Sequence, residues 1–184
     1  MIAKTYTSSL LGIDAILVEV EVDLSPGLPA FATVGLPDSI VRESKDRVKT
    51  ALLNSGYPFP SQKITVNLAP AHLKKEGAGF DLPIAVGILA AMGIIKSEQM
   101  DQLVLVGELS LDGRIKPVTG GLSMAIQVYN KGYKSMILPA ENALEAAVTD
   151  GLAVYPMNHL SQVVEHLNET VLLRPVELDW KTIL

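Results

Sequence analysis

The sequence predicts an α/β fold (α+β in the broader sense) in which helices pack on a β-sheet. Three observations carry this prediction. Hydrophobic residues make up 48% of the 184 residues, which is enough to bury a sizeable core. The run from 82 to 95 is apolar on nearly every side, as is typical of a central, buried helix. From residue 103 onward, short apolar runs alternate with helical stretches, as in layered α/β proteins.

The first half of the chain predicts four strands and two helices. Residues 13–24 alternate apolar and acidic side chains toward their end, and this period of two indicates a half-buried strand. The first helix is expected to start at Pro37, which suits a first turn, and to end before Gly56. Asp38 or Ser39 can cap its start. The strands expected in this half are 3–11, 13–24, 31–34 and 64–68.

The second predicted helix runs from Asp81 to Ile95, directly after a glycine-rich loop. A carboxylate at that start can cap free backbone donors, so we expect a structural role for Asp81 rather than an acid–base role. Further along, Asp112-Gly113 between apolar residues predicts a hairpin. The remaining elements are expected in alternation: strand 103–106, helix 121–130, strand 135–139, helix 141–148, strand 153–156 and helix 160–167.

The end of the chain differs from the rest in character. Residues 169–184 have the pattern of an extended linker, so residues 1–168 are expected to form the domain. No packed element closes the sequence, which predicts that it is part of a longer protein.

Composition and charge exclude several classes of function. The formal net charge of −5 argues against a free-standing nucleic-acid binder but leaves room for a local basic patch. The chain has no cysteine, so it has no disulfide or thiolate metal site. His72, His159 and His166 share no short spacing with carboxylates, so no metal site is expected. The amino terminus lacks a long apolar segment, and the run 82–95 is too short to span a bilayer. We therefore expect a cytoplasmic protein with no membrane partner.

Two glycine-marked loops, 77–79 and 120–121, are each predicted to precede a helix. Backbone N–H groups at a helix start can hold a phosphate, a carboxylate or an oxyanion. Neither loop completes a Walker A or GxGxxG motif, so neither is a nucleotide signature. The favoured interpretation is that the glycines only allow a tight turn and that the adjacent lysines are solvated, with anion binding as the alternative. The candidate anion-binding residues are Lys74, Lys75, Gly77, Gly79, Gly120 and Gly121.

The first predicted helix carries many charges away from its apolar face. Glu43 and Arg47 stand four residues apart, as do Arg42 and Asp46, so these charges can pair along one solvated face. The alternative is a surface for DNA or for a neighbouring subunit. The candidate contact residues are Arg42, Lys45, Arg47 and Lys49.

Several motifs together resemble one bacterial family. They are Gly35–Asp38, Glu43–Ser44, Val66–Pro70, Lys75–Gly77, Phe80–Ala85, Gly107–Gly113 and Pro139–Asn142. The set resembles the amino-terminal domain of the Mg-chelatase-like AAA+ ATPases of the YifB/ComM type, which are linked to competence and DNA recombination. The resemblance covers roughly residues 2 to 168. It implies a fold like that of the Lon protease domain, which is shared with the second domain of the small-subunit ribosomal protein number five.

The resemblance also implies where a catalytic pair would stand. Lon-type proteases use a serine in the first glycine loop and a lysine just after the second Gly-Gly-Leu, and such a dyad needs both groups. In this sequence the stretch from Gly77 to Asp81 has no Ser or Thr, and Ser123 occupies the lysine position. Gly79 and Ser123 are therefore degenerate dyad positions, and no protease activity is expected. Ser110 or Ser123 as an unexpected nucleophile is the alternative.

These observations favour a non-enzymatic accessory domain that helps to assemble or regulate a ring-shaped motor, or contacts DNA. In the resembling family, ATP and Mg²⁺ belong to a module expected after residue 184, and this chain is expected to need no cofactor. The resemblance implies DNA branch migration and self-association into a hexameric ring for the whole protein. A degenerate hydrolase and an anion- or nucleotide-binding module remain the alternatives.

Overall fold

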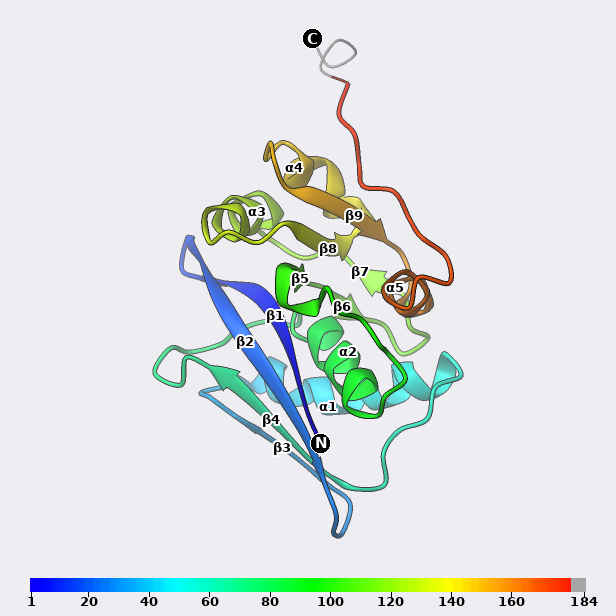
Figure 1. The fold of residues 1–184 in the computed structure, drawn as a ribbon. Coiled ribbons are helices and arrows are strands. Elements are labelled where there is room, and N and C mark those ends of the chain that lie inside the picture. The colour runs from blue at the N-terminus through cyan, green and yellow to red at the C-terminus, as the bar shows by residue number, and fades with distance from the viewer. Residues whose placement is uncertain (180–184) are drawn as a thin grey trace.

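The computed structural model describes residues 1–179 and contains a seven-stranded sheet with helices on both faces (Figure 1). The strands of this sheet are β1 (Ile2–Leu11), β2 (Asp14–Ser25), β3 (Ala30–Val34), β4 (Lys63–Ala69), β5 (Leu103–Leu105), β8 (Ser135–Pro139) and β9 (Ala153–Met157). The helices are α1 (Ser39–Asn54), α2 (Asp81–Ala91), α3 (Gly121–Asn130), α4 (Ala143–Ala147) and α5 (Leu160–Leu167), with single 3₁₀ turns at Met100–Gln102 and Ala140–Asn142. The predicted α/β class is confirmed.

The order of strands across the sheet is β3-β4-β2-β1-β5-β8-β9. β1, β2 and β4 pair antiparallel, whereas the pairs β3–β4, β1–β5, β5–β8 and β8–β9 are parallel. A separate ribbon of β6 (Glu108–Leu109) and β7 (Ile115–Lys116) is the hairpin expected around Asp112-Gly113. The mixed sheet is therefore open, with β3 and β9 at its two edges.

The strands bury side chains on both faces of the sheet, so the domain has two apolar clusters. Val18, Val20 and Val22 of β2 point into a cluster beneath α1, α2 and α5. On the other face, side chains of β5, β8 and β9 form a second cluster beneath α3 and α4. Figure 1 shows this layering, with α3 and α4 on one side of β8 and β9 and α2 on the other.

α2 is the central helix, as its sequence predicts, but it is shorter than expected. Every residue from Asp81 to Ala91 is buried except Ala90, because the helix lies between the sheet and α1. It ends at Ala91 rather than Ile95, since Gly93 takes a positive φ of 77°. The N–H of Gly93 then donates to the Ala90 carbonyl and that of Ile94 to the Leu89 carbonyl, which together close the helix.

Truncation of a side chain on this helix should be costly. Ile88 has no exposed surface, so Ile88→Ala is expected to lower the free energy of unfolding by about 2–5 kcal/mol through lost burial and a residual cavity. Chemical denaturation of the two proteins would measure the difference. Ile13→Ala is the matched control, because Ile13 is 90% exposed, and it should change stability little. Equal losses in the two variants would contradict the placement of Ile88.

The start of α1 corrects a detail of the sequence analysis. Asp38, not Ser39, is the cap, and its Oδ1 accepts a hydrogen bond from the Val41 N–H at 2.7 Å. Pro37 lies before the cap and not in the first turn of the helix. Its backbone forms an isolated parallel β-bridge with Lys75. The helix expected at 141–148 is also shorter, since a 3₁₀ turn occupies its first part.

The segment after α5 keeps contact with the core past residue 168. The N–H of Leu173 donates to Nδ1 of His166 at 3.1 Å, and that of Val176 donates to the Val154 carbonyl at 2.8 Å. Residues 180–184 of the expected linker lie outside the described residues. Over residues 1–179, no helix has the length and apolar character needed to cross a membrane.

Candidate functional site

The first glycine loop and the residues just before the second one, 117–119, line a common hollow of about 420 Å³. A Cβ placed on Gly79 would lie 3.5 Å from Cγ1 of Val118, so the first loop touches the segment before α3. Residues of β1, the start of α1 and β6 complete the wall. The hollow therefore stands where the resemblance to Lon-type proteases implies a catalytic site.

Neither degenerate dyad position supplies a reactive group to this hollow. Gly79 lines it but has no side chain, and the exposed Ser123 is not part of the wall, although its neighbour Met124 is. The hydroxyl of Ser110 donates to the Arg114 carbonyl inside the β6–β7 hairpin. No Lys, Arg or His is found in the wall, which consists of described residues throughout. The pair needed for Ser–Lys chemistry is not assembled in this arrangement.

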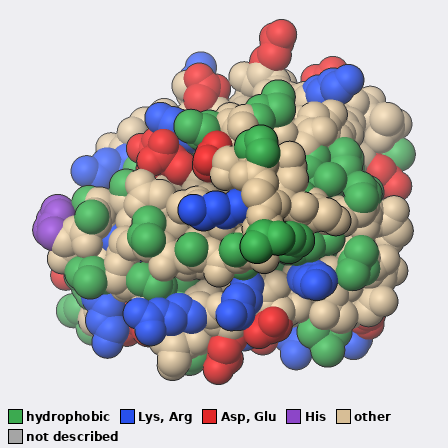
Figure 2. Space-filling model, turned by 90° about the horizontal axis from the view of Figure 1, so that it is seen from below, with side chains coloured by type: hydrophobic (Ala, Val, Ile, Leu, Met, Phe, Trp, Pro, Cys, Tyr) green, Lys and Arg blue, Asp and Glu red, His purple; other side chains and the backbone are tan. Residues whose placement is uncertain are grey.

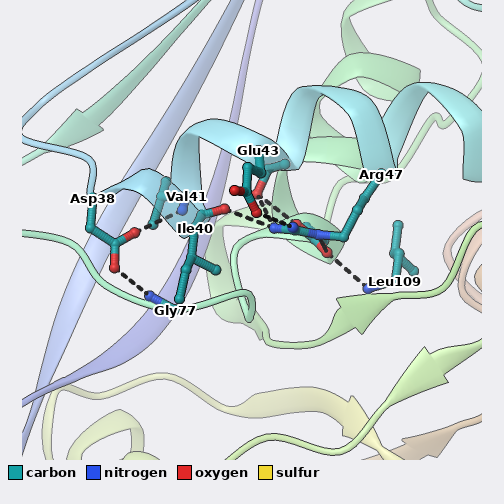
Figure 3. A network of polar contacts seen from close by, with 9 residues as sticks. Asp38, Ile40, Val41, Glu43, Arg47, Gly77 and Leu109 are labelled. Atoms are coloured by element: carbon teal, nitrogen blue, oxygen red, sulfur yellow. Dashed lines mark hydrogen bonds and ion pairs between the residues drawn. The ribbon is translucent and has the colours of Figure 1, made fainter.

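The polar side chains that do line the hollow are carboxylates and hydroxyls. Asp38, Glu76 and Glu108 contribute the carboxylates. Asp38 is committed to the fold, because Oδ2 accepts from the Gly77 N–H at 3.3 Å while Oδ1 caps α1 (Figure 3). Within residues 1–179, no group of three His, Cys, Asp or Glu has the arrangement of a metal site.

Hydroxyl groups of β1 were missed by the sequence analysis. Ser8 donates to Oε1 of Gln127 at 3.1 Å and Ser9 donates to the Glu76 carbonyl at 3.2 Å, so both are tied to other segments. Thr119 joins them from the second loop. The run Thr7-Ser8-Ser9 near the end of the strand Ile2–Leu11 is the signal that could have indicated this lining.

The start of α2 has little capacity left for an external anion. The N–H of Asp81 donates to the Ala78 carbonyl at 3.1 Å, and that of Leu82 donates to the Gly107 carbonyl at 3.0 Å. Pro83 has no N–H to offer. The donors that make a helix start attractive to anions are therefore paired with the protein's own carbonyls.

The candidate lysines do not reach the hollow either. Lys75 is fully buried, its ammonium group donates to the Pro70 carbonyl, and burial lowers its pKa, so the expectation of a solvated or anion-binding side chain is wrong for Lys75. Lys74 pairs with Glu76 at 3.4 Å. At the second loop, a Cβ on Gly121 would lie 2.5 Å from Oε1 of Glu145, so a carboxylate of the protein already sits at that helix start. Gly120 faces Leu10.

Asp81 forms a buried network beside the hollow. Its carboxylate accepts hydrogen bonds from Ser44 Oγ at 2.6 Å, Arg47 Nε at 2.7 Å and the Leu109 N–H at 3.0 Å. The interpretation of Asp81 as a helix cap is wrong in detail, because Phe80 occupies the cap position and the Asp81 side chain instead joins α1, α2 and β6. Burial raises the pKa of Asp81, while the bonds from Arg47, Ser44 and Leu109 act in the opposite direction.

Arg47 differs from the other candidate contact residues of α1. Its guanidinium turns back along the helix to the Asp81 carboxylate and to the Ile40 carbonyl at 2.8 Å, with Glu43 at 3.5 Å (Figure 3). The side chain is 19% exposed. Arg42, Lys45 and Lys49 are exposed. The sequence analysis grouped all four as a surface for DNA or a subunit, but the Arg47 side chain is mostly buried and pairs with Asp81.

The wall of the hollow contains serines but no lysine, so it does not present the Ser–Lys dyad of Lon-type proteases. Residues 20–142 match the family model described as subunit ChlI of Mg-chelatase, which covers more than half of the chain. The chain is 41% identical over 179 residues to YifB of Salmonella typhimurium and 42% identical over 167 residues to the competence protein ComM of Haemophilus influenzae. The chain belongs to this Mg-chelatase-like family.

These relatives are much longer than the chain. The match to YifB covers 97% of the chain but 35% of the relative, and the match to ComM covers 91% and 33%. A more distant match, 26% identical over 162 residues, joins the chain to Lon protease 1 of Bacillus subtilis and covers 81% of the chain and 20% of that protein. This match agrees with the predicted Lon-like fold.

Proposed function

We propose that this domain is a non-enzymatic accessory part of a Mg-chelatase-like AAA+ ATPase of the cytoplasm, and that it assists assembly of the ATPase ring. The observation that carries the proposal is the hollow between the two glycine loops. The resemblance to Lon-type proteases implies a nucleophile at Gly79 and its base at Ser123, but Gly79 has no side chain and the exposed Ser123 does not line the hollow.

ATP and Mg²⁺ would act in the part of the relatives that this chain does not cover. No group of three His, Cys, Asp or Glu within residues 1–179 has the arrangement of a metal site, and the hollow is lined by carboxylates that would repel phosphate. DNA branch migration would then be an activity of the whole ring. Arg42, Lys45 and Lys49 are the residues of this domain that could add DNA contact to it.

An apolar surface on α3 and α4 supports the assembly role. Exposed apolar side chains recur at helical spacing along α3 and from α4 to its C-terminal cap, and the two helices pack against each other over the second cluster. They are Leu122 (39% exposed), Ile126 (46%), Tyr129 (48%), Leu144 (66%) and Val148 (48%). Apolar patches of this kind commonly mark protein–protein contacts. In a ring, such a face would pack against a neighbouring subunit.

The assembly role can be tested in the full-length protein. Ile126→Glu combined with Leu144→Glu should weaken ring formation in ATP and Mg²⁺ by about tenfold or more, because each change would bury a charge in the contact. Mass photometry would measure the fraction of rings. The matched control is Ile13→Glu, which should leave assembly unchanged. Ile13 is 90% exposed and lies in the turn between β1 and β2. Normal rings in the double variant would refute the proposed role of this face.

The absence of peptidase activity is a separate expectation. Fluorogenic peptides incubated with the domain should be cleaved no faster than in buffer. Cleavage that disappears on changing Ser9, Ser110, Thr119 or Ser123 to alanine would instead establish the degenerate hydrolase.

A further inference from the structure

The two edges of the sheet are protected differently. β9 contains Pro156, and its Val154 carbonyl accepts a hydrogen bond from the Val176 N–H, so the chain itself covers part of that edge. β3 is at the other edge, where no described strand pairs with its outer side. It contains neither a charged residue nor a proline between Ala30 and Val34. Edges of native sheets are usually blocked by such devices, so β3 is left open to pairing.

A groove lies directly beside this open edge. It has a volume of about 510 Å³ and separates the start of β3 from α1 and from the loop before β4. Phe31, Leu53 and Phe59 supply apolar side chains to its wall, and Leu53 is 51% exposed. An extended segment laid along β3 would therefore have apolar contacts on one side and free main-chain partners on the other.

The helical wall of the groove is cationic. Lys45 and Lys49 stand one turn apart on α1, both are exposed, and neither forms an ion pair with another described residue. The ammonium group of Lys49 lies 5.6 Å from the centre of the Phe59 ring. Asp46 is the acidic residue of the wall. Figure 2 shows Lys and Arg side chains interleaved with apolar ones on the underside of the molecule, the end at which Figure 1 draws β3 and α1.

We propose that this groove binds an extended acidic peptide, which adds to the sheet as a strand beside β3 and carries aliphatic and acidic residues in turn on the one face that points toward α1. Main-chain hydrogen bonds to β3 would supply affinity, and pockets for alternate side chains would supply specificity. Aliphatic side chains would pack on Phe31 and Phe59, and carboxylates would face Lys45 and Lys49. The site lies outside the hollow between the glycine loops, and the inference does not depend on the proposed accessory role.

A peptide fits this surface better than DNA does. Nucleic-acid affinity rises with the number of phosphates that basic side chains neutralise, and this groove offers Lys45 and Lys49 beside Asp46 in a chain of net charge −5. Its apolar wall and open strand edge would be unused by a phosphate backbone. Both features are what an added strand requires.

The test uses the 184-residue chain and a fluorescein-labelled Val-Thr-Glu-Thr-Val-Thr-Glu peptide with a blocked carboxyl terminus, in which aliphatic and acidic residues follow each other on one face of the strand. Anisotropy titration should give a dissociation constant on the order of 10–100 μM, typical of a short added strand. Combined Lys45→Glu and Lys49→Glu should weaken binding by about fivefold or more, through loss of attraction and added repulsion. Lys131→Glu, the same change of charge at the exposed end of α3, should alter it by less than about twofold.

Hydrogen exchange measured with and without the peptide locates the bound strand. Backbone amides of residues 30–34 should exchange more slowly in the complex, which ordinary charge attraction to α1 would not cause. No binding at a peptide concentration of about 1 mM would overturn the proposal, since it would place the affinity below that of a weak complex. Unchanged binding in the double lysine variant, or protection that bypasses β3, would also overturn it. Tighter, salt-sensitive binding of a single-stranded oligonucleotide that depends on the same lysines would replace the peptide by nucleic acid.

Discussion

Replacing Arg47 by alanine is expected to lower the free energy of unfolding by about 3–5 kcal/mol, because it leaves a buried carboxylate without its cationic partner. The Asp81 side chain has no exposed surface, and Arg47 Nε lies 2.7 Å from its Oδ2. Ser44 and the Leu109 N–H would remain as its hydrogen-bond donors. Urea denaturation of the variant and the wild type would measure the loss.

The matched control is Arg42→Ala on the same helix, where the side chain is exposed. This change should cost less than about 0.5 kcal/mol, as most surface substitutions do. If the two arginine variants lose equal stability, the ion pair between Arg47 and Asp81 contributes little to the stability of the fold.

The stability that Arg47→Ala loses relative to the wild type should depend on pH. Burial already raises the pKa of Asp81 from its ordinary 3.8, and Arg47 opposes that rise. Without Arg47 the folded-state pKa rises further, so the folded variant favours the protonated carboxyl. Proton binding by Asp81 therefore stabilises the folded variant. This stabilisation is complete below the unfolded-state pKa of Asp81 and is lost as pH rises through its folded-state pKa. The difference from wild type should therefore be largest near neutral pH and shrink on acidification, which denaturation at several pH values would detect.

Local patterns predict most elements of this fold. The helices at 121–130 and 160–167 and the strand at 135–139 have the expected bounds, because each is a short periodic run between clear stop signals. The end of α2 was misplaced because apolar residues continue after Gly93, although the backbone turns there. Hydropathy does not distinguish a helix from the turn that closes it, so the left-handed glycine was the better signal.

The candidate site was predicted less completely than the fold. The glycine loops marked the hollow, but its carboxylates come from segments far apart in the chain: Asp38 before α1, Glu76 in the first loop and Glu108 on β6. Arg47 looked like a solvated member of an i,i+4 pair, since that partner is close in sequence. Its stronger partner, Asp81, lies 34 residues away and is brought near only by the packing of α1 on α2. No local pattern encodes such a pairing.

Gly35→Ala is expected to be more disruptive than its size suggests, with a loss of about 3–6 kcal/mol from backbone strain and overpacking together. Gly35 has a φ of 105°, which residues with a side chain rarely adopt. An added Cβ would also lie 2.1 Å from the Leu68 carbonyl oxygen, and this atom belongs to the backbone of β4. Neither a rotamer change nor a small shift of one side chain can relieve that contact.

Gly56→Ala separates the two causes. Gly56 also has a positive φ, 85°, but apart from its two chain neighbours no residue comes within 4 Å of the position that its Cβ would take. Gly56→Ala should therefore lower the free energy of unfolding only by the cost of backbone strain, about 1–2 kcal/mol.

The turn at Gly35 connects β3 to α1 and packs on β4. Because this turn positions Asp38, Gly35→Ala should also loosen the hollow. Faster amide exchange at Gly77 than in the Gly56 variant would report that loosening. Equal stability of the two variants would mean that the close approach to Leu68 is not needed to hold β3, α1 and the first glycine loop together.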